Sequence, residues 1–220
     1  MNFIKLLTFS GLILFGFTAC TTDKEPAPEY RLSQEQLAWQ GYRQGEVLRF
    51  GRRPNGPVRT YRITAVQDRI DTLYVRAGWL PLPQAEPPRY QHVTVMAQRT
   101  DSSAFARQIL DMEMWPDRNA NYQPTLRVQA GWEAFTDAML PLAEVNKRTP
   151  IDTLKHPGTE LLPSATFGPT TYSQVIHAVN RYRSGLPPAG IRPTRHLYYV
   201  RGKGVVAFVE DGTGLWYRLP

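Results

Sequence analysis

Cysteine is almost absent from this chain of 220 residues. The single cysteine, Cys20, lies near the N-terminus at the end of an apolar run. No disulfide can therefore form within the chain, and residues 21–220 offer no thiol nucleophile. The part of the protein after Cys20 has to be held together by its packed core alone.

The sequence signatures of common enzymes are missing as well. No Gly-x-Ser-x-Gly elbow is present, which removes the most frequent serine hydrolase motif. The four histidines (His92, His156, His177 and His196) show neither the His-x-x-x-His spacing nor the His–Glu pairing of a metalloprotease. The run Asp117–Asn121 begins like a calcium loop, but Tyr122 stands where that loop requires glycine. These absences predict no metal ion or other cofactor and favour a protein that is not an enzyme.

Long apolar runs are scarce, and the one that exists is at the N-terminus. Lys5 precedes Leu6–Phe17, an uncharged and almost wholly apolar segment. A basic residue followed by an apolar run of this length is typical of a secretory signal peptide. The run is shorter than the roughly 20 residues that span a bilayer. An uncleaved anchor or an ordinary buried helix is the alternative interpretation.

The residues that follow this run resemble the lipobox of bacterial lipoproteins. They are Phe17-Thr18-Ala19-Cys20, in which small residues precede the cysteine. The resemblance implies cleavage before Cys20, a diacylglycerol on its sulfur and an acyl chain on the new amino group. One chain binds a membrane only marginally, whereas two give stable anchoring. We therefore expect a signal peptide at 1–19, a lipidated Cys20 with a flexible tether over 20–32, and one β-rich domain over 33–220.

The sequence after the tether has the pattern of an antiparallel β protein. Apolar and polar residues alternate along four segments, as half-buried strands require: Tyr61–Ala65, His92–Val95, Leu110–Met114 and Leu126–Ala130. The turn Pro54-Asn55-Gly56-Pro57 predicts a hairpin that joins Glu46–Phe50 to Arg59–Val66. Ser33-Gln34-Glu35-Gln36 has the spacing of a capping box and predicts a short helical turn. The expected fold is mainly β: an antiparallel sheet arranged as a sandwich or a partly open barrel.

The C-terminal part predicts a three-stranded meander. The turn Gly202-Lys203-Gly204 separates Leu197–Arg201 from Val205–Val209, and Glu210–Gly214 leads into Leu215–Leu219. The segment 173–184 fits a helix and a strand equally well by periodicity.

Both ends of the region after the tether resemble small uncharacterised lipoproteins of the Bacteroidota. The resemblance is carried by Trp39, Tyr42, Gly45 and Glu46–Phe50, and by Phe167-Gly168, Tyr172, Val175 and Leu197–Phe208. It implies a β-rich fold, a strand over Ser173–Val179 and a place in the cell envelope, with the outer membrane favoured over the inner. It implies no activity.

Positive charge is unevenly distributed along the chain. The net charge of the chain is +7. Residues 181–220 contain seven basic side chains and only two acidic ones, Glu210 and Asp211. A partner recognised through charge is therefore expected to be anionic and to bind the C-terminal part. The candidate ligand-binding residues are Arg192, Arg195, His196, Arg201 and Lys203.

Three functional hypotheses follow. The first is a lipid-anchored envelope protein with a non-enzymatic binding or scaffolding domain, whose partners are the membrane, through Cys20, and an anionic glycan or envelope protein. The second is a binder of anionic glycans or lipid headgroups through the basic C-terminal residues. The third is a hydrolase that uses Asp111 and Glu113, two carboxylates that share one face of a predicted strand. Nucleic acid fits the charge but not the compartment, and is not an expected partner.

Overall fold

The structure of the protein is a computed structural model. It describes residues 26–53, 55–72, 86–102, 109–117, 123–131, 137–142, 158–179 and 192–220. The predicted signal peptide, Cys20, His156, Arg181 and Arg183 lie outside these ranges. Within them, no helix has the length and apolar character needed to cross a membrane.

The fold is mainly β and antiparallel, as the alternating pattern predicts. One sheet runs in the order β7-β6-β5-β4-β3-β2-β12-β11-β10-β9-β8, and β1 pairs in parallel with β4. The strands are β1 (Glu29–Tyr30), β2 (Val47–Gly51), β3 (Val58–Thr72), β4 (Arg89–Arg99), β5 (Ile109–Asp117), β6 (Gln123–Gly131), β7 (Asp137–Pro141), β8 (Thr159–Phe167), β9 (Thr170–Val179), β10 (Thr194–Val200), β11 (Gly204–Glu210) and β12 (Gly214–Arg218).

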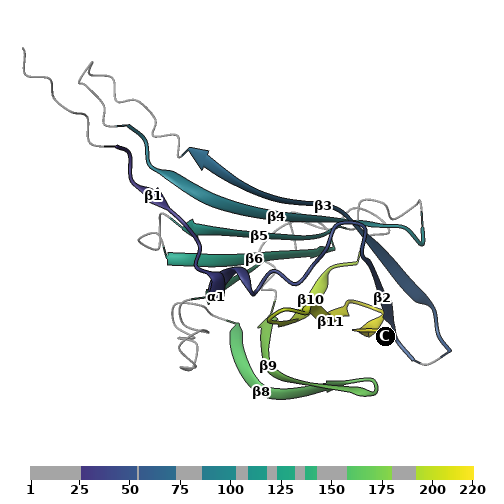
Figure 1. Ribbon diagram of the computed structural model, residues 1–220. Helices are drawn as coiled ribbons and strands as arrows, with labels where there is room; N and C mark the ends of the chain where they lie inside the picture. The colour runs from purple at the N-terminus through teal and green to yellow at the C-terminus, as the bar shows by residue number, and fades with distance from the viewer. Residues whose placement is uncertain are drawn as a thin grey trace, which may run out of the picture.

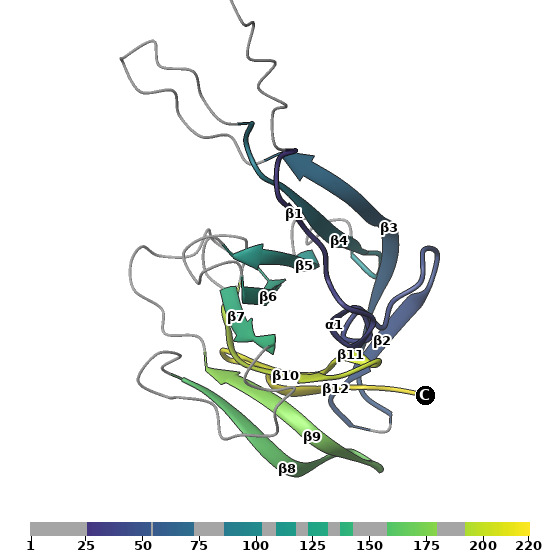
Figure 2. The same ribbon diagram turned by 60° about the vertical axis from the view of Figure 1, so that its left-hand side comes forward.

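The sheet curls into a half-barrel, which is the partly open barrel among the expected arrangements. Figures 1 and 2 show β3 to β6 on one side of the curl and β10 to β12 on the other. The predicted C-terminal meander is present as β10, β11 and β12. Proline lies in both edge strands, Pro141 in β7 and Pro163 in β8. Because proline cannot donate a ladder hydrogen bond, it protects these edges against the addition of another strand.

The predicted helical turn is α1 (Gln34–Leu37). The backbone N–H of Gln36 donates to Ser33 Oγ at 3.3 Å, and the backbone N–H of Ser33 donates to Gln36 Oε1 at 2.7 Å. This is the reciprocal capping box that the sequence indicates. The turn lies next to the turn between β10 and β11, because Arg201 donates a hydrogen bond to the backbone oxygen of Glu35.

In the segment 173–184, which periodicity left open, residues 173–179 belong to a strand, β9, as the family resemblance implies, and residues 180–184 lie outside the described ranges. β9 pairs with both β8 and β10. Gln174 interrupts it with a φ of 51°, and the neighbours Val175 and Ile176 are both fully buried. They belong to two different apolar clusters, one on each face of the sheet. Burial on both faces removes the simple alternation, so periodicity could not identify this strand.

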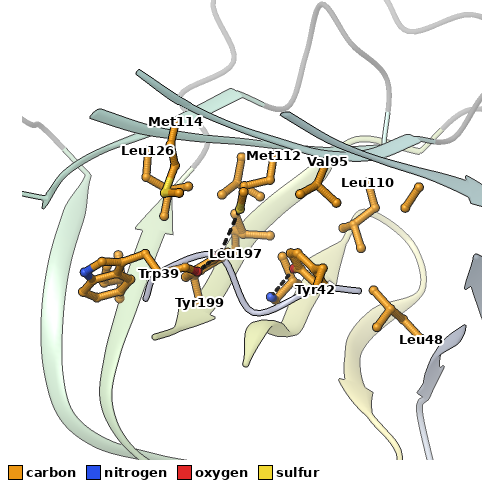
Figure 3. Packing of buried hydrophobic residues seen from close by; sticks show 14 of the residues in the cluster. Trp39, Tyr42, Leu48, Val95, Leu110, Met112, Met114, Leu126, Leu197 and Tyr199 are labelled. Carbon is orange, nitrogen blue, oxygen red and sulfur yellow. Dashed lines mark hydrogen bonds between the residues drawn. The ribbon is translucent and has the colours of Figure 1, made fainter. Parts of the chain in front are cut away.

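The first core fills the inside of the curl. Met112, Met114 and Leu126 of β5 and β6 face Leu197 and Tyr199 of β10 (Figure 3). Trp39 and Tyr42, from the segment after α1, complete this core. The Tyr199 hydroxyl donates to the backbone oxygen of Trp39 at 2.6 Å, so this segment is hydrogen-bonded to the barrel interior.

A second core lies on the outer face of the meander. It consists of Phe167, Val175, Val200, Val206, Ala207 and Tyr217. The β8–β9 hairpin turns back beneath the meander to cover these residues (Figures 1 and 2). The strands β10 to β12 are therefore buried on both faces along part of their length.

The fold begins earlier than the predicted tether allows. Glu29 and Tyr30 pair with Arg89 and Tyr90, and Leu32 is buried at 6% exposure. The backbone N–H of Leu32 donates to Gln91 Oε1 at 3.0 Å. Residues 29–32 of the segment predicted as a tether are therefore hydrogen-bonded to β4.

Candidate anion-binding site

The five residues predicted to bind an anion lie at two ends of the meander. Arg192, Arg195 and His196 are at the start of β10, whereas Arg201 and Lys203 are in the turn between β10 and β11. Seven strand residues at roughly 3.3 Å each separate the two groups by about 20 Å. The five side chains therefore do not form one cluster.

Two of the four arginines and lysines in this set form ion pairs. Arg195 pairs with Asp211, with an Nη2–Oδ2 distance of 2.8 Å. Arg201 donates to the backbone oxygen of Glu35 at 3.1 Å and lies 3.7 Å from its carboxylate. The first interaction joins the β11–β12 turn to β10. The second joins α1 to the β10–β11 turn. Arg192 lies beside Gly212 on the exposed surface.

His196 belongs to a chain of hydrogen bonds across three strands. His177 Nδ1 lies 2.6 Å from Glu160 Oε1, and His177 Nε2 lies 2.9 Å from His196 Nδ1. Tyr198 stacks on the His177 ring with centroids 4.6 Å apart. Burial, and then the adjacent His177 and Arg195, lower the pKa of His196. Sequence reasoning missed this chain because only the register of β8, β9 and β10 brings the three residues together.

Lys203 is the predicted residue that lines a hollow. Arg49 of β2 and Arg218 of β12 also line this hollow, which has a volume of about 520 Å³. This volume falls within the range of about 300–1,000 Å³ found for small-molecule sites. We call this depression the basic hollow. The sequence analysis did not select Arg49 or Arg218, since nothing in the local sequence indicates that β2 pairs with β12.

The remaining lining is of two kinds. Thr170, Thr171 and Tyr172 of β9 contribute hydroxyl groups, and four apolar residues complete the wall: Val47, Val206, Leu219 and Pro220. Val47 is 48% exposed, so an apolar surface is open to a ligand next to the cations.

Two glycines hold the turn that carries Lys203. Gly202 and Gly204 have φ angles of 68° and 76°, in the left-handed region that favours glycine. A Cβ on Gly204 would lie 2.2 Å from the ring of Tyr42. The backbone N–H of Val205 donates to the Tyr42 hydroxyl at 2.6 Å, and burial raises the pKa of that hydroxyl to about 12. The β10–β11 turn is thereby packed against Tyr42, in the segment that follows α1.

A third glycine positions the hydroxyl groups. Gly168, in the turn between β8 and β9, has a φ of 58°, and a Cβ there would lie 2.3 Å from the ring of Tyr217. This close approach seats the hairpin tip over the outer face of β12. Thr170, Thr171 and Tyr172 follow directly and are brought to the hollow.

Basic side chains predominate at the hollow. Arg218 pairs with Glu46, Nη2 to Oε1 at 2.5 Å, and also donates to the backbone oxygen of Lys203. The side chains of Arg49 and Lys203 are exposed and have no hydrogen-bond or ion-pair partner among the residues that the structure describes. Among the described lining residues there is no Asp or Glu. An anion that enters the hollow meets two free cations and pays no cost of breaking an ion pair.

The carboxylates of the hydrolase hypothesis lie elsewhere, on the outer face of β5. Asp111 Oδ1 accepts a hydrogen bond from the backbone N–H of Ala97 at 3.1 Å, and Glu113 lies 3.6 Å from Arg127. Both carboxylates thus interact with groups of the neighbouring strands. Over the described ranges, no group of three or more His, Cys, Asp or Glu side chains is placed to hold a metal ion.

Comparison with family models, curated proteins and solved structures gives no match to this chain. The geometry of the basic hollow is therefore the basis for a functional proposal.

Proposed function

We propose that this protein is a lipid-anchored protein of the bacterial cell envelope that binds an anionic ligand, without catalysis, in the basic hollow. The anchor is the lipid on Cys20 that the lipobox resemblance implies. The ligand-binding groups are Arg49 and Lys203, supported by Arg218. This combines the expected binding domain with the expected anionic ligand and moves the binding site from the five predicted residues to the hollow.

The observation that carries this proposal is the pair of free cations in a hollow of ligand size. Elsewhere on the meander the structure pairs its cations: Arg195 with Asp211 and Arg201 with Glu35. Arg49 of β2 and Lys203 of the β10–β11 turn share one depression. Like charges brought together without a counter-ion repel each other, and a bound anion relieves that repulsion.

Charge reversal tests the site. The full chain with Cys20→Ala, free of lipid, is titrated calorimetrically with a heparin oligosaccharide, which carries both carboxylates and sulfates. We expect the double variant Arg49→Glu/Lys203→Glu to weaken binding at least tenfold, because each change replaces attraction by repulsion. Binding of the parent protein should weaken as salt rises.

The matched control reverses two cations outside the hollow, Arg192→Glu/Arg195→Glu, and alters the net charge by the same amount. We expect it to retain most of the affinity. Equal loss in both double variants would mean that net charge alone attracts the ligand and would reject the hollow as the site. Absence of binding by the parent protein would reject the anionic ligand itself.

The anchor has its own test in the producing bacterium. We expect the protein to sediment with the membrane fraction and Cys20→Ala to move it to the soluble fraction, because the lipid requires that sulfur. Metabolic labelling with a palmitate analogue should mark the parent protein and not the variant. A parent protein that is unlabelled and soluble would contradict the proposed anchoring.

A further inference from the structure

The basic hollow combines three kinds of lining group, and this combination narrows the chemical class of its ligand. Cations come from β2, β12 and the β10–β11 turn, hydroxyls from the start of β9, and apolar side chains lie between them. A simple anion would use only the cations. A ligand that uses the whole lining has to carry a negative group, hydroxyls and an apolar face.

The hydroxyl groups are available to a ligand. Thr170 and Tyr172 have no hydrogen-bond partner on their side-chain oxygens among the residues that the structure describes. Thr171 Oγ1 lies 2.9 Å from Thr166 Oγ1, and a hydroxyl can both donate and accept. The start of β9 therefore presents donors and acceptors next to the cations. A sugar hydroxyl, which also donates and accepts, complements such a surface.

The hollow lies far from the point at which the chain enters the fold. The chain enters the fold at Glu29. Glu29 pairs with Arg89 of β4, and Arg89 pairs in turn with Thr72 at the end of β3. Arg49, which lines the hollow, pairs with Thr60 near the start of β3. The twelve residue steps of β3 between these points span about 40 Å at roughly 3.3 Å per residue. Figure 1 shows β1 and the C-terminus at opposite ends of the molecule.

We infer that the ligand of the basic hollow is an acidic saccharide, a sugar that carries a carboxylate. Arg49 and Lys203 bind the carboxylate, Thr170 and Tyr172 bind ring hydroxyls, and Val47 and Leu219 contact the apolar face of the ring. This inference rests on the proposed function, since it specifies the ligand of the same site.

Four probes separate the saccharide from other anions. The full chain with Cys20→Ala is titrated with oligogalacturonate, with fully methyl-esterified oligogalacturonate, with polyglutamate of equal charge, and with phosphatidylglycerol vesicles. The ester retains the sugar without the charge, and polyglutamate retains the charge without the sugar. We expect oligogalacturonate to bind at least tenfold more tightly than each of the other three.

Two variants remove hydroxyl groups at nearly constant shape, Thr170→Val and Tyr172→Phe. Each should weaken oligogalacturonate binding by about 2- to 10-fold, the range for one hydrogen bond, and leave polyglutamate binding unchanged. Ser164→Ala, on the same hairpin but outside the hollow, is the control and should change neither.

The outcomes distinguish this inference from the proposed function. If polyglutamate binds as tightly as oligogalacturonate and the hydroxyl variants change nothing, the hollow is an anion site and the saccharide is rejected. If the vesicles bind most tightly, a lipid headgroup replaces the saccharide. If no anionic probe binds, the proposed function fails together with the inference.

Discussion

The basic side chains at the two ends of the β10–β12 meander differ in burial and in ion pairing. At the end with the β11–β12 turn, Arg59 of β3 is buried and bonded on both terminal nitrogens to Glu210, at 2.7 and 2.5 Å. At the end with the β10–β11 turn, Arg49 and Lys203 face an open hollow. The same kind of side chain is buried at one end and exposed at the other.

At the closed end, a network of described residues surrounds the buried ion pair, although Arg59 Nε itself has no hydrogen-bond partner among them. Arg59 lies over the ring of Trp216 at 4.0 Å, and Glu210 also accepts a hydrogen bond from Thr213 at 2.7 Å. The Trp216 Nε1–H donates in turn to Thr213 Oγ1 at 2.9 Å. A buried pair with this geometry is strongly destabilised when one member is lost, because the other charge stays buried alone. We therefore expect a binding site where basic side chains lack acidic partners in the structure. A high number of basic residues in one part of the sequence does not identify such a site.

The largest expected effect breaks the closed end. Glu210→Gln leaves the Arg59 charge buried without a counter-charge and should lower the free energy of unfolding by about 3–5 kcal/mol. Chemical denaturation measures this loss. The control is the next residue: Asp211→Asn removes the partner of the half-exposed Arg195 and should cost less than about 1 kcal/mol. Equal costs would show that the buried pair has no special role in stability.

An intermediate effect is expected at the open end, where Gly168 seats the hairpin tip. Gly168→Ala combines a left-handed φ with a Cβ placed 2.3 Å from the Tyr217 ring. We expect a loss of about 2–4 kcal/mol of unfolding free energy, from backbone strain and overpacking together. Affinity for an anionic saccharide should also fall, because the tip carries Thr170 and Tyr172.

Gly214→Ala is the matched control for that change. Gly214 has a φ of 82°, but a Cβ there would meet no atom within 4 Å. Its expected cost is the strain alone, about 1–2 kcal/mol, with unchanged ligand affinity. A Gly168→Ala protein that behaves like Gly214→Ala in both measurements would contradict the role given to the tip.

The smallest expected effect is a pH dependence from the histidine chain. The pKa of His196 is lowered in the folded protein, so the unfolded chain, with a pKa of about 6.5, binds the proton more tightly. The stability from the neutral ring is therefore complete above about pH 6.5 and is lost as the pH falls through the folded-state pKa. Denaturation at pH 8 and at pH 5 should show a smaller pH-dependent loss in His196→Gln than in the parent protein. An identical loss would exclude His196 as a contributor.

The sequence predicted most of the strands because their signal is local. β3, β4, β5 and β6 alternate visibly, and the capping box at Ser33 is reproduced in its hydrogen bonds. β1, β7 and β8 were not expected. β8 carries Pro163 and partly exposed residues on both faces, so neither propensity nor alternation marks it as a strand.

The basic hollow was only partly accessible to sequence reasoning. Lys203 stood out within the basic C-terminal region, but Arg49 lies more than 150 residues earlier in the chain. The excess of C-terminal charge was a poor guide, because Arg195 and Arg201 are paired with Asp211 and Glu35. Pairing between distant residues depends on strand order, which no local pattern reports.

By itself, the sequence determined the class of the fold, the position of the helical turn and the C-terminal meander. These features arise from periodicity, capping and glycine turns, which act over a few residues. Only the tertiary structure decided that the sheet curls into a half-barrel, that β8 and β9 cover the outer face of the meander, and which cations remain free. Those outcomes depend on the register between β2 and β12 and on the close approach of Gly168 to Tyr217, and both join residues that are far apart in the chain.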